Sequence, residues 1–126
     1  MRDRRRSERA GRRAEDLAVW LLRLKGYRIL ARRCRTPAGE IDIIARRRRT
    51  LAFVEVKQRG DLRSALESVS PRQQRRIVAA AAGFVSTRPL FAAFCLRFDV
   101  ILVRKFWQLR HIPAAFGQET GECRPF

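Results

Sequence analysis

The sequence predicts an α/β fold in which a single mixed β-sheet is flanked by helices, in the order α-β-β-β-α-β. Three observations lead to this fold class. Apolar residues repeat at helical spacing in residues 7–25 and again in 71–85. Short β-branched segments lie between and after these stretches. The strand, helix and strand within residues 51–103 have the length of a right-handed parallel crossover.

The N-terminal half predicts one helix followed by three strands. Ser7 is a good N-cap residue for the helix, and Gly26 suits its C-terminal end. A turn rich in Pro and Gly separates the first two strands, and an arginine-rich connector of hairpin length separates the next two. The expected strands are Tyr27–Arg33, Glu40–Arg46 and Leu51–Lys57.

The C-terminal half predicts a second helix and a long strand. Ser70 and Pro71 form a cap followed by proline at the first helical position. Residues 58–69 are polar and are expected to form a loop. The remaining elements are expected to be a strand at Phe94–Val103, a short edge strand at Phe106–Arg110 and a final helical turn at Ile112–Phe116.

The chain length of 126 residues suggests a single domain with a core of its own. We expect residues 1–9 to form a basic arm, residues 10–116 to form the domain, and residues 117–126 to form a loose tail.

The net charge of +17 favours a polyanionic partner, with nucleic acid first and an anionic membrane surface second. The alternative is compositional, because nearly all the basic residues are arginine and alanine is abundant, as in a GC-rich genome. No run of about 18 apolar residues is present, so no membrane segment and no membrane partner are expected.

The three cysteines, Cys34, Cys95 and Cys123, are odd in number and lack the spacing of metal ligands. This favours a reducing compartment over a disulfide framework or a zinc site. The basic N-terminus is not followed by an uninterrupted apolar region, so a signal peptide is not expected. We therefore expect a cytoplasmic protein.

The predicted hairpin of the second and third strands brings two carboxylates together. If the loop is even and Arg46 faces Leu51, counting back places Asp42 opposite Glu55 on one face. Like charges roughly 5 Å apart on a sheet are destabilising unless a shared proton, a cation or a metal ion compensates them. The opposite face is expected to be the core and to hold Ile41, Ile43, Ala45, Ala52, Val54 and Val56.

Lys57 follows Glu55 by two residues and lies on the same face, opposite Glu40 in this register. Two carboxylates for Mg²⁺ and an ammonium group beside them are typical of metal-dependent phosphodiester cleavage. The alternatives are an ion pair between Lys57 and Glu40, and carboxylates neutralised by nearby arginines such as Arg59.

Several motifs, in matching order and spacing, resemble the YraN-like family, uncharacterised protein family 0102. The resemblance covers roughly residues 10–116. It is carried by Gly11-x-x-Ala14-Glu15-x-x-Ala18, Gly39-Glu40-Ile41-Asp42-Ile43-Ile44-Ala45, Phe53-Val54-Glu55-Val56-Lys57-x-Arg59, Val69-x-Pro71 and Arg97-Phe98-Asp99-Val100.

This resemblance implies a restriction-endonuclease-like fold, similar to that of archaeal Holliday-junction resolvases. The PD-(D/E)xK core of that superfamily binds Mg²⁺ or Mn²⁺. By position, Asp42 and Glu55 would be metal ligands, Lys57 would orient the attacking water, and Glu15 would complete the site. Glu15 is also compatible with an ordinary surface charge. Two departures concern substrate contacts: Arg33 stands where asparagine is expected, and Gln73-Gln74 where lysine is common.

The function expected from these features is a metal-dependent, structure-selective endonuclease acting on DNA rather than RNA. The alternatives are a non-catalytic nucleic-acid-binding module on the same fold and a protein-interaction subunit. A homodimer is possible, because related resolvases pair and residues 106–107 offer an apolar edge. The expected nucleic-acid contacts are Arg33, Arg35, Arg59, Arg72, Arg75, Arg76 and Gln74.

Overall fold

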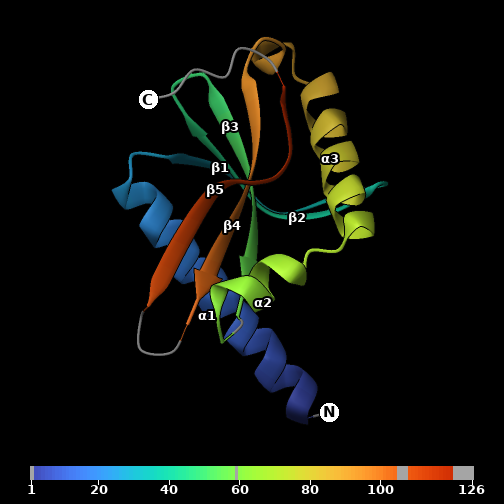
Figure 1. Ribbon diagram of the computed structural model, residues 1–126. Coiled ribbons are helices and arrows are strands. Elements are labelled where there is room, and N and C mark those ends of the chain that lie inside the picture. The colour runs from blue at the N-terminus through green and yellow to red at the C-terminus, as the bar shows by residue number, and fades with distance from the viewer. Residues whose placement is uncertain (1, 59, 105–107, 121–126) are drawn as a thin grey trace.

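The structure, a computed structural model, describes residues 2–58, 60–104 and 108–120 (Figure 1). Its side chains are described for residues 11–58, 60–104 and 108–117. The elements are α1 (Arg2–Leu24), β1 (Arg28–Thr36), β2 (Gly39–Arg47), β3 (Thr50–Lys57), α2 (Leu62–Glu67), α3 (Pro71–Ser86), the 3₁₀ turn η1 (Pro89–Phe91), β4 (Cys95–Val103) and β5 (Leu109–Thr120).

The strands form one five-stranded mixed sheet in the order β1-β2-β3-β4-β5. Strands β3 and β4 are parallel, and the other neighbours are antiparallel. The connection between β3 and β4 contains α2 and α3, as a crossover between parallel strands requires. The α/β fold with a single mixed sheet and the parallel crossover are therefore confirmed.

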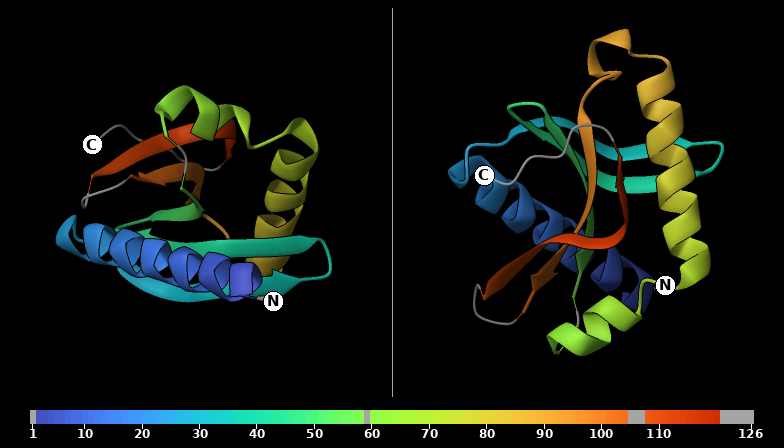
Figure 2. Two further views of the ribbon diagram at one scale, coloured as in Figure 1. Left: turned by 90° about the horizontal axis from the view of Figure 1, so that it is seen from below. Right: turned by 45° about the horizontal axis from the view of Figure 1, so that its top comes forward.

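Both faces of the sheet are buried under helices (Figure 2). α1 covers one face with an apolar stripe that includes Ala14, Ala18 and Leu22. α3 covers the other face through residues such as Ile77 and Phe84. The side chains of β2 and β3 alternate between these two clusters, so each strand is apolar on both sides.

This arrangement corrects the expectation of a single core face. Ile43, Ala45 and Val54 pack toward α1 as expected, but Ile41 belongs to the cluster under α3. Strict alternation fails at Ile41 because it lies beyond the last residue of β2 that pairs with β3. A strand released from one neighbour can twist further and turn its side chains toward the other layer.

The N-cap Ser70 accepts a hydrogen bond from the Gln73 backbone N–H at 3.1 Å, and Pro71 opens α3 as predicted. Two other expectations are wrong. α1 begins at Arg2, so Ser7 lies inside the helix rather than at its cap. The polar stretch expected to be a loop contains α2, capped by Asp61, whose carboxylate accepts from the Ser64 N–H.

The C-terminal segment differs most from the prediction. The helical turn expected at residues 112–116 is part of β5, which also continues through residues 117–120 of the expected tail. Ile112 faces Val100 and Phe116 faces Phe98, with register shifts along the pairing. Residues four apart lie on the same face of a regular strand as well as of a helix, so this apolar spacing fits both structures. Residues 106 and 107, expected in an edge strand and a dimer contact, lie outside the described residues.

Strands β2 and β3 separate near one end of the sheet. Their pairing ends at Ile43 and Val54, whereas β2 stays paired to β1 as far as Gly39 and Thr36. The β1–β2 hairpin therefore extends as an arm on its own, and α3 packs near its tip. A Cβ atom added to Gly39 would lie 3.5 Å from the Arg76 Cβ. The candidate functional site lies at this separation.

Candidate functional site

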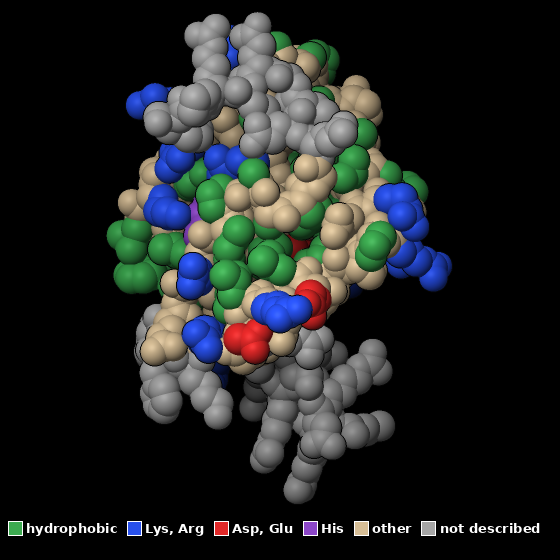
Figure 3. Space-filling model, viewed as in Figure 1, with side chains coloured by type: hydrophobic (Ala, Val, Ile, Leu, Met, Phe, Trp, Pro, Cys, Tyr) green, Lys and Arg blue, Asp and Glu red, His purple; other side chains and the backbone are tan. Residues whose placement is uncertain are grey.

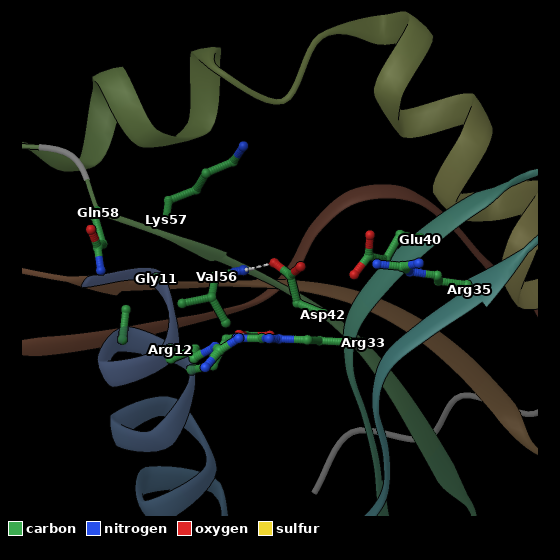
Figure 4. A pocket seen from close by; sticks show the side chains of 11 residues that line it. Gly11, Arg12, Arg33, Arg35, Glu40, Asp42, Val56, Lys57 and Gln58 are labelled. Atoms are coloured by element: carbon green, nitrogen blue, oxygen red, sulfur yellow. Dashed lines mark hydrogen bonds and ion pairs between the residues drawn. The ribbon is translucent and has the colours of Figure 1, made fainter. Parts of the chain in front are cut away.

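A cavity of about 600 Å³ lies where β2 and β3 separate, against the N-terminal half of α1 (Figure 4). Its lining combines residues of α1, β1 and β2 with the end of β3 and its continuation. The lining residues are Gly11, Arg12, Ala14, Glu15, Arg33, Arg35, Glu40, Asp42, Val56, Lys57 and Gln58.

Asp42 lies at the point where the two strands part. The predicted register is confirmed, because Arg46 faces Leu51 and the paired residues follow in step to Ile43 and Val54. Beyond this point the backbone pairing of β2 with β3 is replaced by a hydrogen bond to a side chain. The Val56 N–H donates to Asp42 Oδ2 at 2.8 Å (Figure 4). This bond satisfies a β3 backbone donor that has lost its β2 neighbour.

Asp42 and Glu55 are electrostatically coupled. Burial raises the pKa of Asp42 to about 7, and the charge of Glu55 adds to this, although the Val56 N–H acts against it. Burial also raises the pKa of Glu55, against the opposing effects of Lys57 and of hydrogen bonds that favour its ionised form. Two coupled carboxyl groups resist simultaneous ionisation, so they lose their protons in steps that belong to the pair.

Lys57 and Gln73 contact Glu55. Lys57 Nζ lies 3.4 Å from Glu55 Oε1, and Gln73 Nε2 donates to the same oxygen at 3.0 Å. Glu55 is 8% exposed, and its carboxylate is held by Gln73 of α3 and by Lys57 of its own strand. The alternative ion pair between Lys57 and Glu40 is therefore wrong. Glu40 lies beyond the β2–β3 pairing, opposite Arg35 of β1, and is exposed.

Gln73 is a site residue that the sequence did not identify, since Gln74 was the expected contact. The Gln74 side chain instead donates to the Val69 carbonyl at 3.0 Å. Both glutamines lie in the first turn of α3, and only the orientation of that helix over β3 decides between them. The N-cap bond from Ser70 to Gln73 fixes the backbone from which Gln73 reaches Glu55.

Glu15 projects from α1 into the cavity wall and is buried, with 7% of its surface exposed. Arg33 donates to Glu15 Oε2 through Nε at 2.8 Å and through Nη2 at 2.5 Å. The Arg33 backbone has φ of +50°, a left-handed conformation that is uncommon for arginine. Glu15, the expected third metal ligand, is thus paired with Arg33, an expected nucleic-acid contact.

The other expected nucleic-acid contacts fall into two groups. Arg35 lines the cavity. Arg72, Arg75 and Arg76 are exposed on the first turns of α3, near the tip of the β1–β2 arm. Arg59 lies outside the described residues.

The residues present fit a hard divalent cation at Asp42 and Glu55. The pair supplies carboxylate oxygens in a partly buried site, and a cation would relieve the repulsion by Glu55 that helps to raise the pKa of Asp42. Within the described part of the chain, however, no three His, Cys, Asp or Glu side chains are grouped so as to hold a metal ion. Glu15, held by Arg33, does not complete such a group.

A second charged cluster surrounds Asp99, which is fully buried in β4. Arg97 donates to Asp99 Oδ1 at 2.9 Å and to Oδ2 at 2.8 Å. His111 Nε2 lies 2.7 Å from Oδ2, and the Ala114 N–H donates to Oδ1 at 3.0 Å. Arg97 also bonds the Tyr27 hydroxyl. Asp99 is therefore half of a structural ion pair with Arg97.

The expectation of no disulfide bonds is wrong for one of the cysteines. Cys34 is a free, half-buried thiol. Cys95 is disulfide-bonded, which the odd cysteine count did not lead us to expect. None of the helices in the described ranges is long and apolar enough to cross a membrane.

Comparison with known proteins identifies the family to which this chain belongs. Residues 14–103 match the model of Uncharacterised protein family UPF0102. A UPF0102 protein of Parvibaculum lavamentivorans is 56% identical over 108 residues, covering 86% of this chain and 81% of the relative. A UPF0102 protein of Bradyrhizobium diazoefficiens is 53% identical over 112 residues, covering 89% and 84%. With its motifs, its fold and these relatives in agreement, the chain belongs to the UPF0102 family.

Proposed function

We propose that this protein binds nucleic acid and acts as a metal-dependent, structure-selective endonuclease that cleaves DNA phosphodiester bonds. The single observation that carries the proposal is the pair formed by Asp42 and Glu55. Glu55 is buried and Asp42 partly buried, the two are coupled where two strands separate, and Asp42 lines the cavity there. Perturbed carboxyl groups in a cleft mark candidate functional sites.

Each residue of the site would have a distinct role. Asp42 and Glu55 would hold Mg²⁺ or Mn²⁺, and the Val56 N–H keeps the Asp42 carboxylate oriented at 2.8 Å. The cation, when bound, would stabilise negative charge on phosphate and lower the pKa of a bound water. Lys57, which reaches Glu55 from within the cavity lining, would orient the attacking water. Gln73 would keep Glu55 in place.

The charge distribution supports a nucleic-acid substrate. Figure 3 shows Lys and Arg side chains spread over one face of the molecule, with few acidic side chains among them. Arginines of β1 line the cavity, and further arginines are exposed at the start of α3. Phosphate contacts of this kind are independent of sequence. We therefore propose selection of DNA by branches, flaps or ends, and favour DNA over RNA. The resemblance to resolvases of the restriction-endonuclease-like superfamily points the same way.

The direct experiment compares the wild-type protein with Asp42→Asn and Lys57→Met on branched, flapped and single-stranded DNA, with Mg²⁺ or Mn²⁺. Asp16→Asn is the matched control, because Asp16 is an exposed carboxylate of α1 that pairs with Arg32. We expect cleavage by the wild type and the control, and at least a hundredfold loss in both site variants. Equal cleavage by all four proteins would indicate a contaminating nuclease and contradict the proposal.

A second candidate function is a non-catalytic nucleic-acid-binding module on the same fold. The observation that favours it is the pairing of Glu15 with Arg33, which neutralises the third carboxylate of the cavity. Titration calorimetry with Mn²⁺ separates the two candidates. Heat of binding in the wild type but not in Asp42→Asn supports the nuclease. DNA binding without Mn²⁺ binding and without cleavage selects the module.

A further inference from the structure

Four arginines gather at the end of the sheet opposite the cavity. Arg46 lies near the end of β2, and Arg48 and Arg49 form the β2–β3 turn, which closes between Arg47 and Thr50. Arg88 follows α3 and precedes η1. We refer to Arg46, Arg48, Arg49 and Arg88 as the arginine patch. Arg48, Arg49 and Arg88 are exposed, and Arg46 is partly exposed.

Aromatic rings hold the guanidinium groups at the turn. The Arg46 guanidinium carbon lies 4.7 Å from the centroid of the Phe94 ring and 5.9 Å from that of Phe91. Arg49 lies 5.7 Å from the Phe94 centroid. The two rings contact each other edge to face at 5.1 Å and belong to the buried cluster under α3. The rigid core therefore restrains the two arginines.

Arg88 is restrained in the same way at the end of α3. Its guanidinium carbon lies 3.8 Å from the centroid of Phe84, and its Nη1 donates to the Phe84 carbonyl at 3.0 Å. A guanidinium stacked on a ring keeps its remaining N–H groups available at its edge, where phosphate binds. Restraint before binding also reduces the entropy lost when a ligand is bound.

The turn also stores backbone strain at an arginine. Arg48 has φ of +54°, a conformation that glycine or asparagine adopts more easily. The Arg46 Nε–H donates to the Arg48 carbonyl at 3.0 Å and braces the turn. Strain retained at an exposed position is a reason to suspect a function for its side chain.

The charge of the patch is not balanced within the described residues. The ion pairs there involve Arg32, Arg33, Lys57, Arg63, Arg97 and His111 as cations. None involves a member of the arginine patch. Guanidinium groups brought together in this way repel one another, and a polyanion would remove that repulsion.

The patch and the cavity lie at opposite ends of β2. Arg48 lies six positions after Asp42, which corresponds to about 20 Å at ~3.3 Å per strand residue. Duplex DNA advances ~3.4 Å per base pair, so this distance spans about six base pairs. A duplex that leaves the cavity along this direction would reach the patch after roughly half a helical turn.

We propose that the arginine patch is a second contact for the phosphate backbone of duplex DNA, about six base pairs from the phosphate at the cavity. The inference rests on the proposed function and adds to it the kind of substrate held: a branched or flapped DNA with a duplex arm long enough to reach both ends of the sheet. The two contacts together select DNA by the length of that arm.

The test measures binding to branched DNA whose hairpin-capped arm has about 4 or about 12 base pairs, shorter and longer than the predicted span. EDTA prevents cleavage, and fluorescence anisotropy reports the affinity. We expect the wild type to bind the long arm at least tenfold more tightly. Arg48→Gln/Arg49→Gln should abolish that preference, leave binding of the short arm unchanged and reduce the salt slope for the long arm by about 2.

Two further variants serve as controls for this result. Arg48→Gly removes one charge and suits the positive φ, so loss of the arm preference in this variant cannot be attributed to misfolding. Arg63→Gln/Arg110→Gln removes two exposed arginines of α2 and β5 that belong to neither the patch nor the cavity lining. This control should keep the preference for the long arm.

The outcomes separate this inference from the proposed function. Equal binding of the two arms by the wild type, or an equal loss in the control pair, overturns the patch and leaves the nuclease proposal intact. Absence of any DNA binding at low salt overturns both. Binding of the patch to anionic phospholipid vesicles, with no dependence on arm length, would assign it to a membrane surface and also overturn the inference.

Discussion

Two buried acidic sites on neighbouring strands of this sheet have opposite electrostatic character. Asp99 of β4 lies beside Val54 of β3, and Glu55 lies beside Val100, so the two carboxylates point to opposite faces. Burial alone would raise the pKa of Asp99, but hydrogen bonds and charge from His111 and Arg97 outweigh it and lower that pKa. At the cavity, burial and mutual repulsion prevail and raise the pKa of Asp42 to about 7.

The number of compensating donors distinguishes a structural carboxylate from a candidate functional one. Asp99 has donors on both oxygens, and its surroundings leave no role for a further ligand. Asp42 has one backbone donor and a like charge beside it, on the wall of a cavity. Incomplete compensation costs stability in the free protein and leaves a site that a cation can stabilise.

The largest expected effect concerns Asp99. Asp99→Ala should destabilise the fold by about 3 to 5 kcal/mol, because it leaves the Arg97 charge buried without its carboxylate. The measurement is the free energy of unfolding in urea. Asp16→Ala is the matched control and should change it by less than about 1 kcal/mol, since the Asp16 side chain is 64% exposed. A small effect of Asp99→Ala would mean that the cluster is less compensated than its bonds indicate.

For Asp42 the effect on the free energy of unfolding should have the opposite sign, because removal of its charge should stabilise the fold. Its pKa is raised in the folded state, to about 7 from an ordinary value of 3.8, so the folded state binds a proton that the unfolded state has lost between these pH values. Stability should therefore fall as pH rises from about 4 to 7. Asp42→Asn removes this cost and keeps an oxygen acceptor for the Val56 N–H.

In EDTA, Asp42→Asn should be more stable than wild type at pH 8 by an amount on the order of 2 kcal/mol, with the difference shrinking toward pH 4. Urea unfolding at a series of pH values measures this. Saturating Mn²⁺ should raise the stability of the wild type alone and so reduce the gap. A variant that is less stable at pH 8 would show that Asp42 is compensated in the same manner as Asp99.

A substitution of Tyr27 tests the structural cluster around Asp99. Tyr27→Phe removes the hydroxyl that accepts from Arg97 but retains the ring on which Arg47 stacks at 4.5 Å. A buried donor without its acceptor should cost about 1 to 2 kcal/mol of unfolding free energy. The pH dependence of stability should stay as in the wild type, because the carboxylates at the cavity are untouched. A changed pH profile would show that the two clusters are coupled.

Arg33 should give the smallest effect. Arg33→Asn breaks the pair with Glu15, but the Arg33 side chain is 42% exposed and asparagine tolerates the positive φ better. The change in unfolding free energy should be below about 1 kcal/mol. If Glu15 serves as a third ligand, freeing it should strengthen Mn²⁺ binding in calorimetry. Unchanged or weaker binding would leave Glu15 as a structural partner of Arg33.

Much of the fold follows from local patterns in the sequence. Alternation in residues 39–57, an even connector and the pair Ser70-Pro71 were sufficient to predict two strands, their register and the start of α3. The adjacency of Asp42 and Glu55 follows from that register. Of β5 only the start was predicted, within the edge strand ending at Arg110, because the four-residue spacing of Ile112 and Phe116 fits a helical turn as well as a strand.

Local sequence is sufficient to predict which residues form the central hairpin and which carboxylates meet at its end, because side-chain alternation and turn length act between near neighbours. Three features of the site come from long-range packing: β2 leaves β3 after Ile43, Glu15 is held by Arg33, and Gln73 rather than Gln74 reaches Glu55. These outcomes depend on how α1 and α3 pack across the two faces of a twisted sheet. That packing is a sum of many distant contacts, and no short stretch of sequence records it.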